Sequence, residues 1–168
     1  MKWRRLKDHN SKVFIHGFTD GRDVDPKSSI NDLKNLEKFT QDKNCELASI
    51  IGRYYSMDRD NRWERTKLAY DLICKGKGKK VSSFVDEIKS SYNNNCTDEF
   101  LMPMIKTDSN NNPIGVVSEG DVIIFFNFRT DRGRQLTRVM TQSDFNEFET
   151  NNEKYHFVTM TNYDSSFK

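Results

Sequence analysis

Arginine and carboxylate side chains gather in three short segments of this 168-residue chain, at residues 20–23, 52–65 and 129–134. The densest is residues 52–65, GRYYSMDRDNRWER, which interleaves four arginines and three acidic residues with two tyrosines and a tryptophan. A guanidinium group presents a rigid fork of donors that matches two oxygens of a phosphate or a carboxylate. Several such forks aimed into one crevice would bind a small anion that carries more than one charge.

Each segment directly follows an apolar run that is typical of a buried strand. These runs are residues 13–18, 45–51 and 122–128. Helical spacing of apolar residues then appears after each segment, so the order strand, charged loop, helix occurs three times. This alternation predicts an α/β fold with a mostly parallel sheet and helices on both faces. Because loops at the carboxyl ends of parallel strands meet at one edge, we expect the three charged segments to converge.

The remaining elements are predicted from the same kinds of pattern. A turn at residues 108–113 indicates a short β-hairpin between residues 101–106 and 114–117. Residues 155–160 are a last strand candidate, and residues 1–10 resemble the tail of a helix. The helices are expected to begin at a cap on Ser29 and stop near Asn44, to span residues 61–74, to follow a cap on Ser82 or Ser83, and to lie around residues 136–140.

The composition of the chain limits the classes of protein to which it can belong. Hydrophobic residues make up 35% and charged residues 31% of the chain, which suits one polar domain with a real core. A net charge of +2 is too close to neutral to predict a nucleic-acid binder. The three cysteines lack metal-site spacing, so we expect reduced thiols and no metal in this chain. The longest apolar run, residues 122–126, is too short to span a membrane, and the charged start lacks a secretory core. These features predict a cytoplasmic protein without a membrane partner.

Each charged or aromatic residue, taken alone, also has a structural interpretation beside the functional one. An isolated Arg–Asp pair is usually a surface ion pair that contributes roughly 0–1 kcal/mol. Three clusters, each at the end of a predicted strand, favour a binding site instead. The aspartates can orient the arginines, and one could act as a general acid or base, for which Asp23 beside Arg22 is the best candidate. His9 and His156 have no partner at metal spacing, and Tyr54 and Tyr55 stay open. Residues expected to be structural or solvated are Arg4, Arg5, Arg65, Arg138, His16 and Trp63.

Three motifs occur in this order: HGFTDGRD at residues 16–23, GRYYSMDRDNRW at residues 52–63 and FNFRTDR at residues 126–132. Together they closely resemble the cofactor-independent (2,3-bisphosphoglycerate-independent) phosphoglycerate mutase family. TDEF at residues 97–100 is a weaker match. The resemblance runs from about residue 12 to the end of the chain.

The resemblance implies a two-domain enzyme of the alkaline-phosphatase superfamily. One domain carries a serine nucleophile and two manganese ions, and an inserted α/β domain binds 3- or 2-phosphoglycerate. Residues 1–168 look like most of that inserted domain, incomplete at the N-terminus, with the phosphatase-like domain absent. The family's substrate-binding His upstream of DGRD and the other domain's lysine are also absent, so this piece is not expected to turn over alone.

The resemblance also implies roles for individual residues. Asp23 is suggested as the proton-transfer group at the glycerate hydroxyl. The expected substrate-binding residues are Arg22, Asp23, Arg53, Arg59, Arg129 and Arg132. No cofactor is expected in this chain, since the manganese ligands belong to the other domain. The expected partners are phosphoglycerate and the missing domain in cis, and the chain is expected to be a monomer.

Two alternatives stay open at this point. The chain could be a stand-alone anion-binding module, perhaps for nucleic acid, with Tyr54 and Tyr55 as a stacking surface. The aspartates among the arginines argue against it, because they would repel a polyanion. The chain could also be a scaffolding domain in which every arginine is held in an ion pair.

Overall fold

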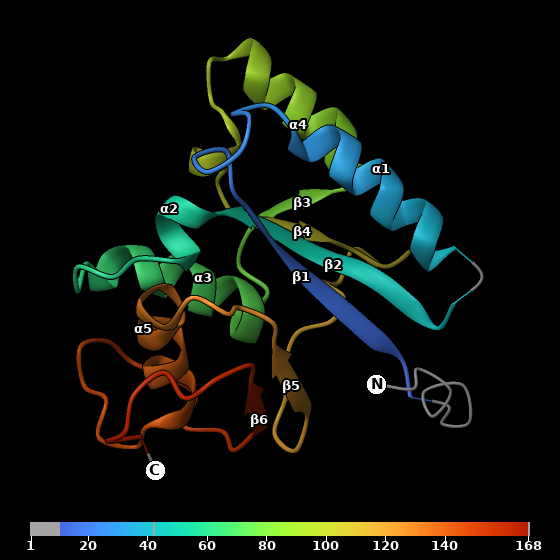
Figure 1. The fold of residues 1–168 in the computed structure, drawn as a ribbon. Coiled ribbons are helices and arrows are strands. Elements are labelled where there is room, and N and C mark those ends of the chain that lie inside the picture. The colour runs from blue at the N-terminus through green and yellow to red at the C-terminus, as the bar shows by residue number, and fades with distance from the viewer. Residues whose placement is uncertain (1–10, 42, 168) are drawn as a thin grey trace.

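A four-stranded sheet with the strand order β1-β2-β4-β3 lies at the centre of the protein (Figure 1). The computed structural model describes residues 11–41 and 43–167. The strands are β1 (Val13–Thr19), β2 (Cys45–Gly52), β3 (Lys79–Val81) and β4 (Met104–Lys106). β1 pairs with β2 and β3 with β4 in parallel, whereas β2 and β4 are antiparallel. The predicted α/β fold with a mostly parallel sheet is therefore confirmed.

Helices cover both faces of this sheet, as predicted (Figure 1). On one face, α1 (Ser29–Thr40) and α4 (Phe84–Asn93) bury their apolar residues against Leu47 and Ile50 of β2. On the other face, α3 (Trp63–Lys75) and α5 (Thr130–Thr141) pack against Ile51. Ile50 and Ile51 point to opposite faces because side chains alternate along a strand. Two further helical elements in the described part of the chain are short, α2 (Arg53–Ser56) and the 3₁₀ helix η2 (Asp98–Phe100).

The third predicted strand lies outside the central sheet. The apolar run at residues 122–128 forms β5 (Val122–Phe125), which pairs in parallel with β6 (His156–Thr159) in a separate two-stranded sheet. The prediction that three successive strands share one sheet is wrong for this strand, because an apolar run indicates a strand but does not specify its partner. The β6 prediction is confirmed. The rings of Phe18 and Phe125 lie 6.0 Å apart and bring the ends of β1 and β5 together.

The predicted hairpin is shorter than expected. β4 begins only at Met104, and beyond it one antiparallel bridge joins Thr107 to Pro113. Asp108 holds the turn by accepting hydrogen bonds from the backbone N–H groups of Asn110 and Asn112. The chain then leaves the hairpin, since Val117 donates its N–H to the Ile73 carbonyl of α3. The predicted helix tail at residues 1–10 lies outside the described residues.

The start of α1 is held by a distant carboxylate. Ser29 does not cap this helix as predicted but is its first residue. Its N–H donates to Asp98 Oδ2 at 2.9 Å and its hydroxyl to Asp98 Oδ1 at 2.5 Å. The fully buried Asp98 also accepts from the Tyr92 hydroxyl, and its backbone carbonyl accepts from Thr19 Oγ1 at 2.7 Å. Asp98 thus joins α1, α4 and the end of β1. Ser83 does cap α4, as predicted.

Replacing Asp98 tests this arrangement. Asp98→Ala leaves the Ser29 N–H and the Tyr92 hydroxyl without their acceptor, and we expect a loss of about 3 kcal/mol in the free energy of unfolding. Urea denaturation followed by circular dichroism measures the change. The control Glu37→Ala removes an exposed carboxylate from α1 and should change the stability by less than about 0.5 kcal/mol. Equal stability of the two variants would contradict the assigned role of Asp98.

Candidate anion-binding site

The site forms where β1 and β2 end. β1 leads into residues 20–23, where Gly21 has a left-handed φ of 66°. β2 ends at Gly52, whose N–H donates to the Leu101 carbonyl at 2.8 Å. A Cβ at Gly52 would collide with the backbone carbonyl of Glu99, so only glycine lets β2 approach η2 this closely. The next residue is Arg53, the first residue of α2.

Arg53 is the buried centre of the site. Only 3% of this residue is exposed. Its Nη1 donates to Asp20 Oδ1 at 2.7 Å and to Asp23 Oδ2 at 2.8 Å. Asp20 Oδ1 also accepts from the backbone N–H groups of Arg22 and Asp23, each at 3.0 Å. Asp20 therefore shapes the loop and fixes the guanidinium of Arg53 at the same time.

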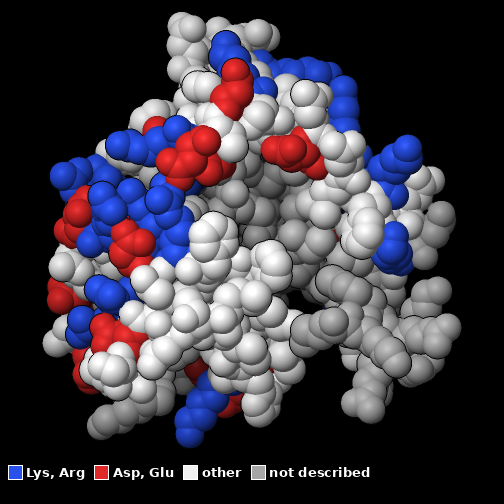
Figure 2. Space-filling model, in the orientation of Figure 1, with Lys and Arg blue, Asp and Glu red and all other residues white. Residues whose placement is uncertain are grey.

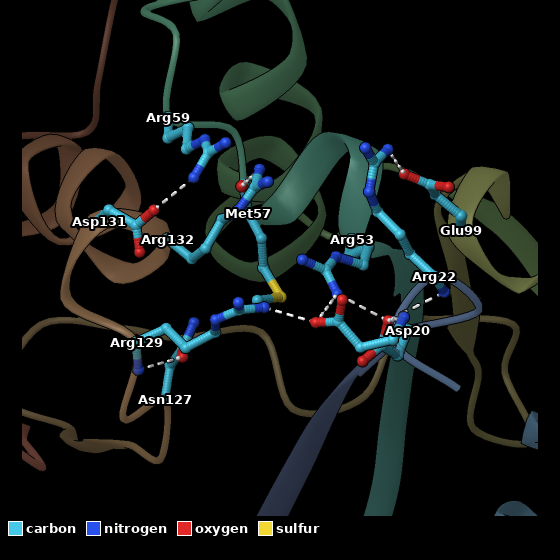
Figure 3. Close-up of polar contacts among 11 residues, drawn as sticks. Asp20, Arg22, Arg53, Met57, Arg59, Glu99, Asn127, Arg129, Asp131 and Arg132 are labelled. Atoms are coloured by element: carbon cyan, nitrogen blue, oxygen red, sulfur yellow. Dashed lines mark hydrogen bonds and ion pairs between the residues drawn. The ribbon is translucent and has the colours of Figure 1, made fainter.

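Arg129 brings the third charged segment to the same carboxylate (Figure 3). Its Nη1 donates to Asp23 Oδ2 at 2.5 Å. Its backbone N–H donates to Asn127 Oδ1 at 3.0 Å. One carboxylate oxygen of Asp23 is thus shared by arginines from segments that follow different sheets. The predicted meeting of these segments is observed, although β5 does not lie in the central sheet.

Arg59 and Arg132 connect the second segment to α5. Arg59 Nη1 lies 2.9 Å from Asp131 Oδ2, and Arg132 Nη1 donates to the Met57 carbonyl at 2.9 Å. Both α5 residues lie in the first turn of that helix, which begins at Thr130 rather than near residue 136 as predicted. Burial lowers the pKa of Arg132, and the nearby charges of Arg59 and Arg53 lower it further. This repulsion between cations makes an anion favourable here.

Arg22 is the candidate residue that points elsewhere. Its Nη1 lies 3.1 Å from Glu99 Oε1, on the η2 side of the site (Figure 3). Arg53, Arg129 and Asp23 are thus in direct contact, while Arg22 is held beside them by a separate ion pair.

The arginines determine the ionisation of both loop aspartates. The hydrogen bond from Arg53 holds the pKa of Asp23 below its usual range, and the charge of Arg129 acts in the same direction. Burial would raise the pKa of Asp20, but hydrogen bonds from the Asp23 N–H and from Arg53 outweigh it and the pKa is lowered. Both groups are carboxylates at neutral pH. In this state Asp23 is a weak base, because an effective general base has a pKa near the working pH.

Several contributors were not singled out from the sequence, namely Glu99, Asp131, Asn127 and Asp58. All four lie inside motifs quoted from the sequence, but only Asp58 and Asp131 stand directly beside an arginine in the chain, which was a usable signal. The buried Asp58 accepts hydrogen bonds from the N–H groups of Asp60 and Arg62, each at 3.0 Å, and so shapes the segment that carries Arg59.

The aromatic residues near the site are packed. Arg65 lies over the ring of Tyr54 at 3.7 Å, and the Tyr54 and Phe100 rings are 5.0 Å apart. Trp63 packs against Phe145 in the core, as predicted. Tyr54 is therefore held on both sides and does not form the open stacking surface of the nucleic-acid alternative.

His16 is a satisfied core histidine, as predicted. It hydrogen-bonds to Ser49 Oγ at 2.7 Å and to the Gly115 carbonyl at 3.0 Å. Burial lowers its pKa to about 4. Within residues 11–41 and 43–167, no three His, Cys, Asp or Glu side chains are grouped to hold a metal ion. In the same part of the chain, every helix is too short or too polar to cross a bilayer.

The fold and the site define an α/β domain in which arginines from three segments surround shared carboxylates. The chain belongs to the family described as BPG-independent PGAM N-terminus, whose model matches residues 3–165. This finding confirms the resemblance carried by the three sequence motifs.

Known proteins that are similar to this chain support the family assignment. The 2,3-bisphosphoglycerate-independent phosphoglycerate mutase of Flavobacterium psychrophilum is 58% identical over 157 residues, which are 94% of this chain and 31% of that protein. The protein of the same name from Clostridium acetobutylicum is 44% identical over 163 residues, 96% of this chain and 32% of its own length. A crystal structure of Leishmania mexicana phosphoglycerate mutase superposes with a TM-score of 0.84 at 28% identity, covering 94% of this chain and 30% of that one. The chain thus spans about a third of the length of these relatives.

The lowered pKa values of Asp20 and Asp23 predict an acid-sensitive site. Their folded pKa values lie below the unfolded value of about 3.9, so their stabilising contribution is complete above that pH and is lost as the pH falls further. We expect the wild type to lose more stability between about pH 5 and pH 3 than an Asp20→Asn/Asp23→Asn variant. Urea unfolding midpoints at the two pH values measure the difference.

A charge-matched control makes this comparison specific. Asp25→Asn/Asp32→Asn removes two exposed carboxylates outside the site and should follow the wild-type profile. If the Asp20/Asp23 variant also follows the wild-type profile, the arginines do not stabilise these carboxylates as the contacts indicate.

Proposed function

We propose that this chain is the substrate-binding domain of a 2,3-bisphosphoglycerate-independent phosphoglycerate mutase. The parent enzyme would interconvert 3- and 2-phosphoglycerate in glycolysis through a phosphoserine in the rest of the polypeptide. The observation that carries the proposal is the shared oxygen of Asp23, which lies 2.8 Å from Arg53 and 2.5 Å from Arg129. Two guanidinium groups around one oxygen anion form a site that a carboxylate or phosphate oxygen of the substrate can also occupy.

The arginines divide into a fixed part and an adaptable part. Arg53 is buried and held by two carboxylates, so it supplies a preorganised positive charge. Arg59 and Arg129 are about half exposed and can turn from their aspartate partners toward a ligand. A multiply charged phosphoglycerate offers more oxygens than Asp23 and Asp131 do, and it would compete for these donors. Arg132 adds a guanidinium that donates to a backbone carbonyl rather than to a carboxylate.

Asp23 gains a role in proton transfer once the ligand binds. When a substrate oxygen takes its place at Arg129, one cause of its lowered pKa is removed. The pKa of Asp23 then moves back toward its ordinary range, and the carboxylate can accept a proton from the glycerate hydroxyl and return it to the product. Arg53 continues to fix the orientation of Asp23 during this exchange.

The remaining features of the proposal concern the rest of the parent enzyme. By the family resemblance, the two manganese ions and the serine belong to the other domain, and within the described residues no three His, Cys, Asp or Glu side chains are grouped for a metal. We further propose that the enzyme is cytoplasmic, belongs to the alkaline-phosphatase superfamily and is monomeric, and that residues 1–168 form one domain that is inactive alone.

Anion binding by the chain tests the arginine site and separates it from a scaffolding role. Ligand at tenfold its Kd should stabilise the fold by about 1.4 kcal/mol, or roughly 3–6 °C in Tm for a domain of this size. We expect such a shift with 3-phosphoglycerate and a smaller one with sulfate, measured by thermal melts. Arg129→Ala should abolish the shift.

The matched control is Arg62→Ala, which removes an exposed arginine of residues 52–65 that has no assigned role. It should keep the wild-type shift. Equal shifts in both variants would contradict the assignment of Arg129, and no shift in the wild type would favour arginines that act only in ion pairs.

Kinetics of the full-length enzyme test Asp23. Asp23→Asn keeps a hydrogen-bond acceptor for Arg53 but removes the proton acceptor, so we expect kcat to fall by about 10²–10⁴-fold with KM changed only a few-fold. Asp25→Asn, at an exposed position two residues away, should leave both constants unchanged. A wild-type kcat for Asp23→Asn would exclude proton transfer by this residue.

A further inference from the structure

One face of the two-stranded sheet is exposed and apolar. Side chains that alternate along β5 and the residues after it are open to solvent, as are Val158 on β6 and Met160 directly after that strand. We call these six residues the apolar strip: Val122 and Ile124 (67% exposed each), Phe126 and Phe128 (78% each), and Val158 and Met160 (51% each). The strip crosses both strands, because Ile124 pairs with Val158 in the β5–β6 register. Exposed apolar patches of this kind on soluble proteins usually mark interaction sites.

Within residues 11–41 and 43–167, no layer of the fold covers this face. The core beneath α3 and α5 contains Ile51 of the central sheet together with Ile123, Phe125 and Phe157 of the second sheet. The same helical layer therefore covers one face of both sheets. The other face of the central sheet is covered by α1 and α4, whose core contains no residue of β5 or β6. Among the described residues, the second sheet thus has one covered and one uncovered face.

The apolar strip also borders the anion site. Phe128 directly precedes Arg129, and Asn127 between the two exposed phenylalanines holds the Arg129 N–H. Figure 2 shows charged side chains gathered along one side of a hollow, while the wall formed in the region of β5 is largely uncharged. Arg129, Asp23 and Arg59 of the anion site are about half exposed. A segment that covers the strip would therefore lie next to the proposed substrate and exclude water from it.

We propose that the apolar strip docks a segment of the parent polypeptide that lies outside these 168 residues, and that this segment also closes the open side of the anion site. The inference rests on the proposed function, since it requires a longer parent enzyme. Chain length supports this occupant, because the match covers 31% of the Flavobacterium psychrophilum protein and leaves roughly two-thirds of its residues outside the shared region. Position supports it as well, because a cover in cis would complete the site in every molecule.

Association in trans tests the proposal. The 168-residue chain is mixed with a polypeptide that joins the residues of the Flavobacterium psychrophilum relative lying outside the matched region. Isothermal titration calorimetry and analytical ultracentrifugation should show a one-to-one complex. The strip variant Ile124→Thr/Phe126→Ser should bind at least tenfold more weakly and should also bind less of the dye ANS. The control Phe39→Ser/Met102→Ser changes two exposed apolar residues outside both the strip and the anion site and should bind like the wild type.

The outcomes separate this proposal from the proposed function. Circular dichroism and Tm establish that the strip variant is folded, and it should keep the anion-induced Tm shift, whereas Arg129→Ala should lose that shift and keep the association. Equal binding by the strip variant and the wild type would overturn the docking surface. Absence of a complex would do the same. Self-association of the chain that the strip variant abolishes, without binding of the complementary polypeptide, would assign the strip to a second copy and overturn the proposed occupant.

Discussion

The geometry of the site depends on one buried charge, the guanidinium of Arg53. A charged group that is 3% exposed loses most of its hydration and is tolerated only when it is paired and hydrogen-bonded. Burial alone would lower the pKa of Arg53, but the hydrogen bonds to Asp23 and Asp20 raise it, so the charge is retained. Both aspartates are consequently fixed, and with them the loop between β1 and α1. The same oxygen of Asp20 accepts the backbone N–H groups of its own loop, which holds this carboxylate in place beside Arg53.

This pairing gives Asp23 two opposing properties. Its contacts with Arg53 and Arg129 hold it in place and also make it a weaker base. A ligand that competes for Arg129 would make Asp23 a stronger base again, while Arg53 would still hold the carboxylate in place. Substrate binding and activation of the base are thereby linked through a single carboxylate oxygen. The scaffolding alternative accounts for the ion pairs but not for Arg132, whose Nη1 donates to the Met57 carbonyl rather than to a carboxylate.

Local sequence patterns predicted those parts of the fold that local physics determines. The apolar runs before Thr19 and Gly52 form adjacent parallel strands, and Ser83 caps α4 through its own neighbouring backbone. Ser29 has an equally suitable side chain, yet its contacts are to Asp98, 69 residues away in the chain. No local pattern reveals a partner at that distance. The same limit explains why β5 was expected in the central sheet.

The meeting of the charged segments was predicted correctly, but the reason given for it holds only in part. Arg53 and Arg129 were expected to meet because parallel strands of one sheet end at one edge, but their strands belong to different sheets. The segments that carry Arg53 and Arg129 are instead positioned by the packing of α3 on α5. A buried hydrogen bond of 3.2 Å joins Thr66 to Gln135, and Leu136 lies in the same core as residues of α3.

Helix packing rather than strand pairing therefore sets the gap that Asp23 bridges. α3 follows the segment that carries Arg59, and α5 begins one residue after Arg129. A change in the α3–α5 contact would move the second and third charged segments relative to each other while leaving the β1–β2 pairing intact. The geometry of the anion site therefore depends on core residues that do not contact the anion, because the site is assembled from segments that follow two different sheets.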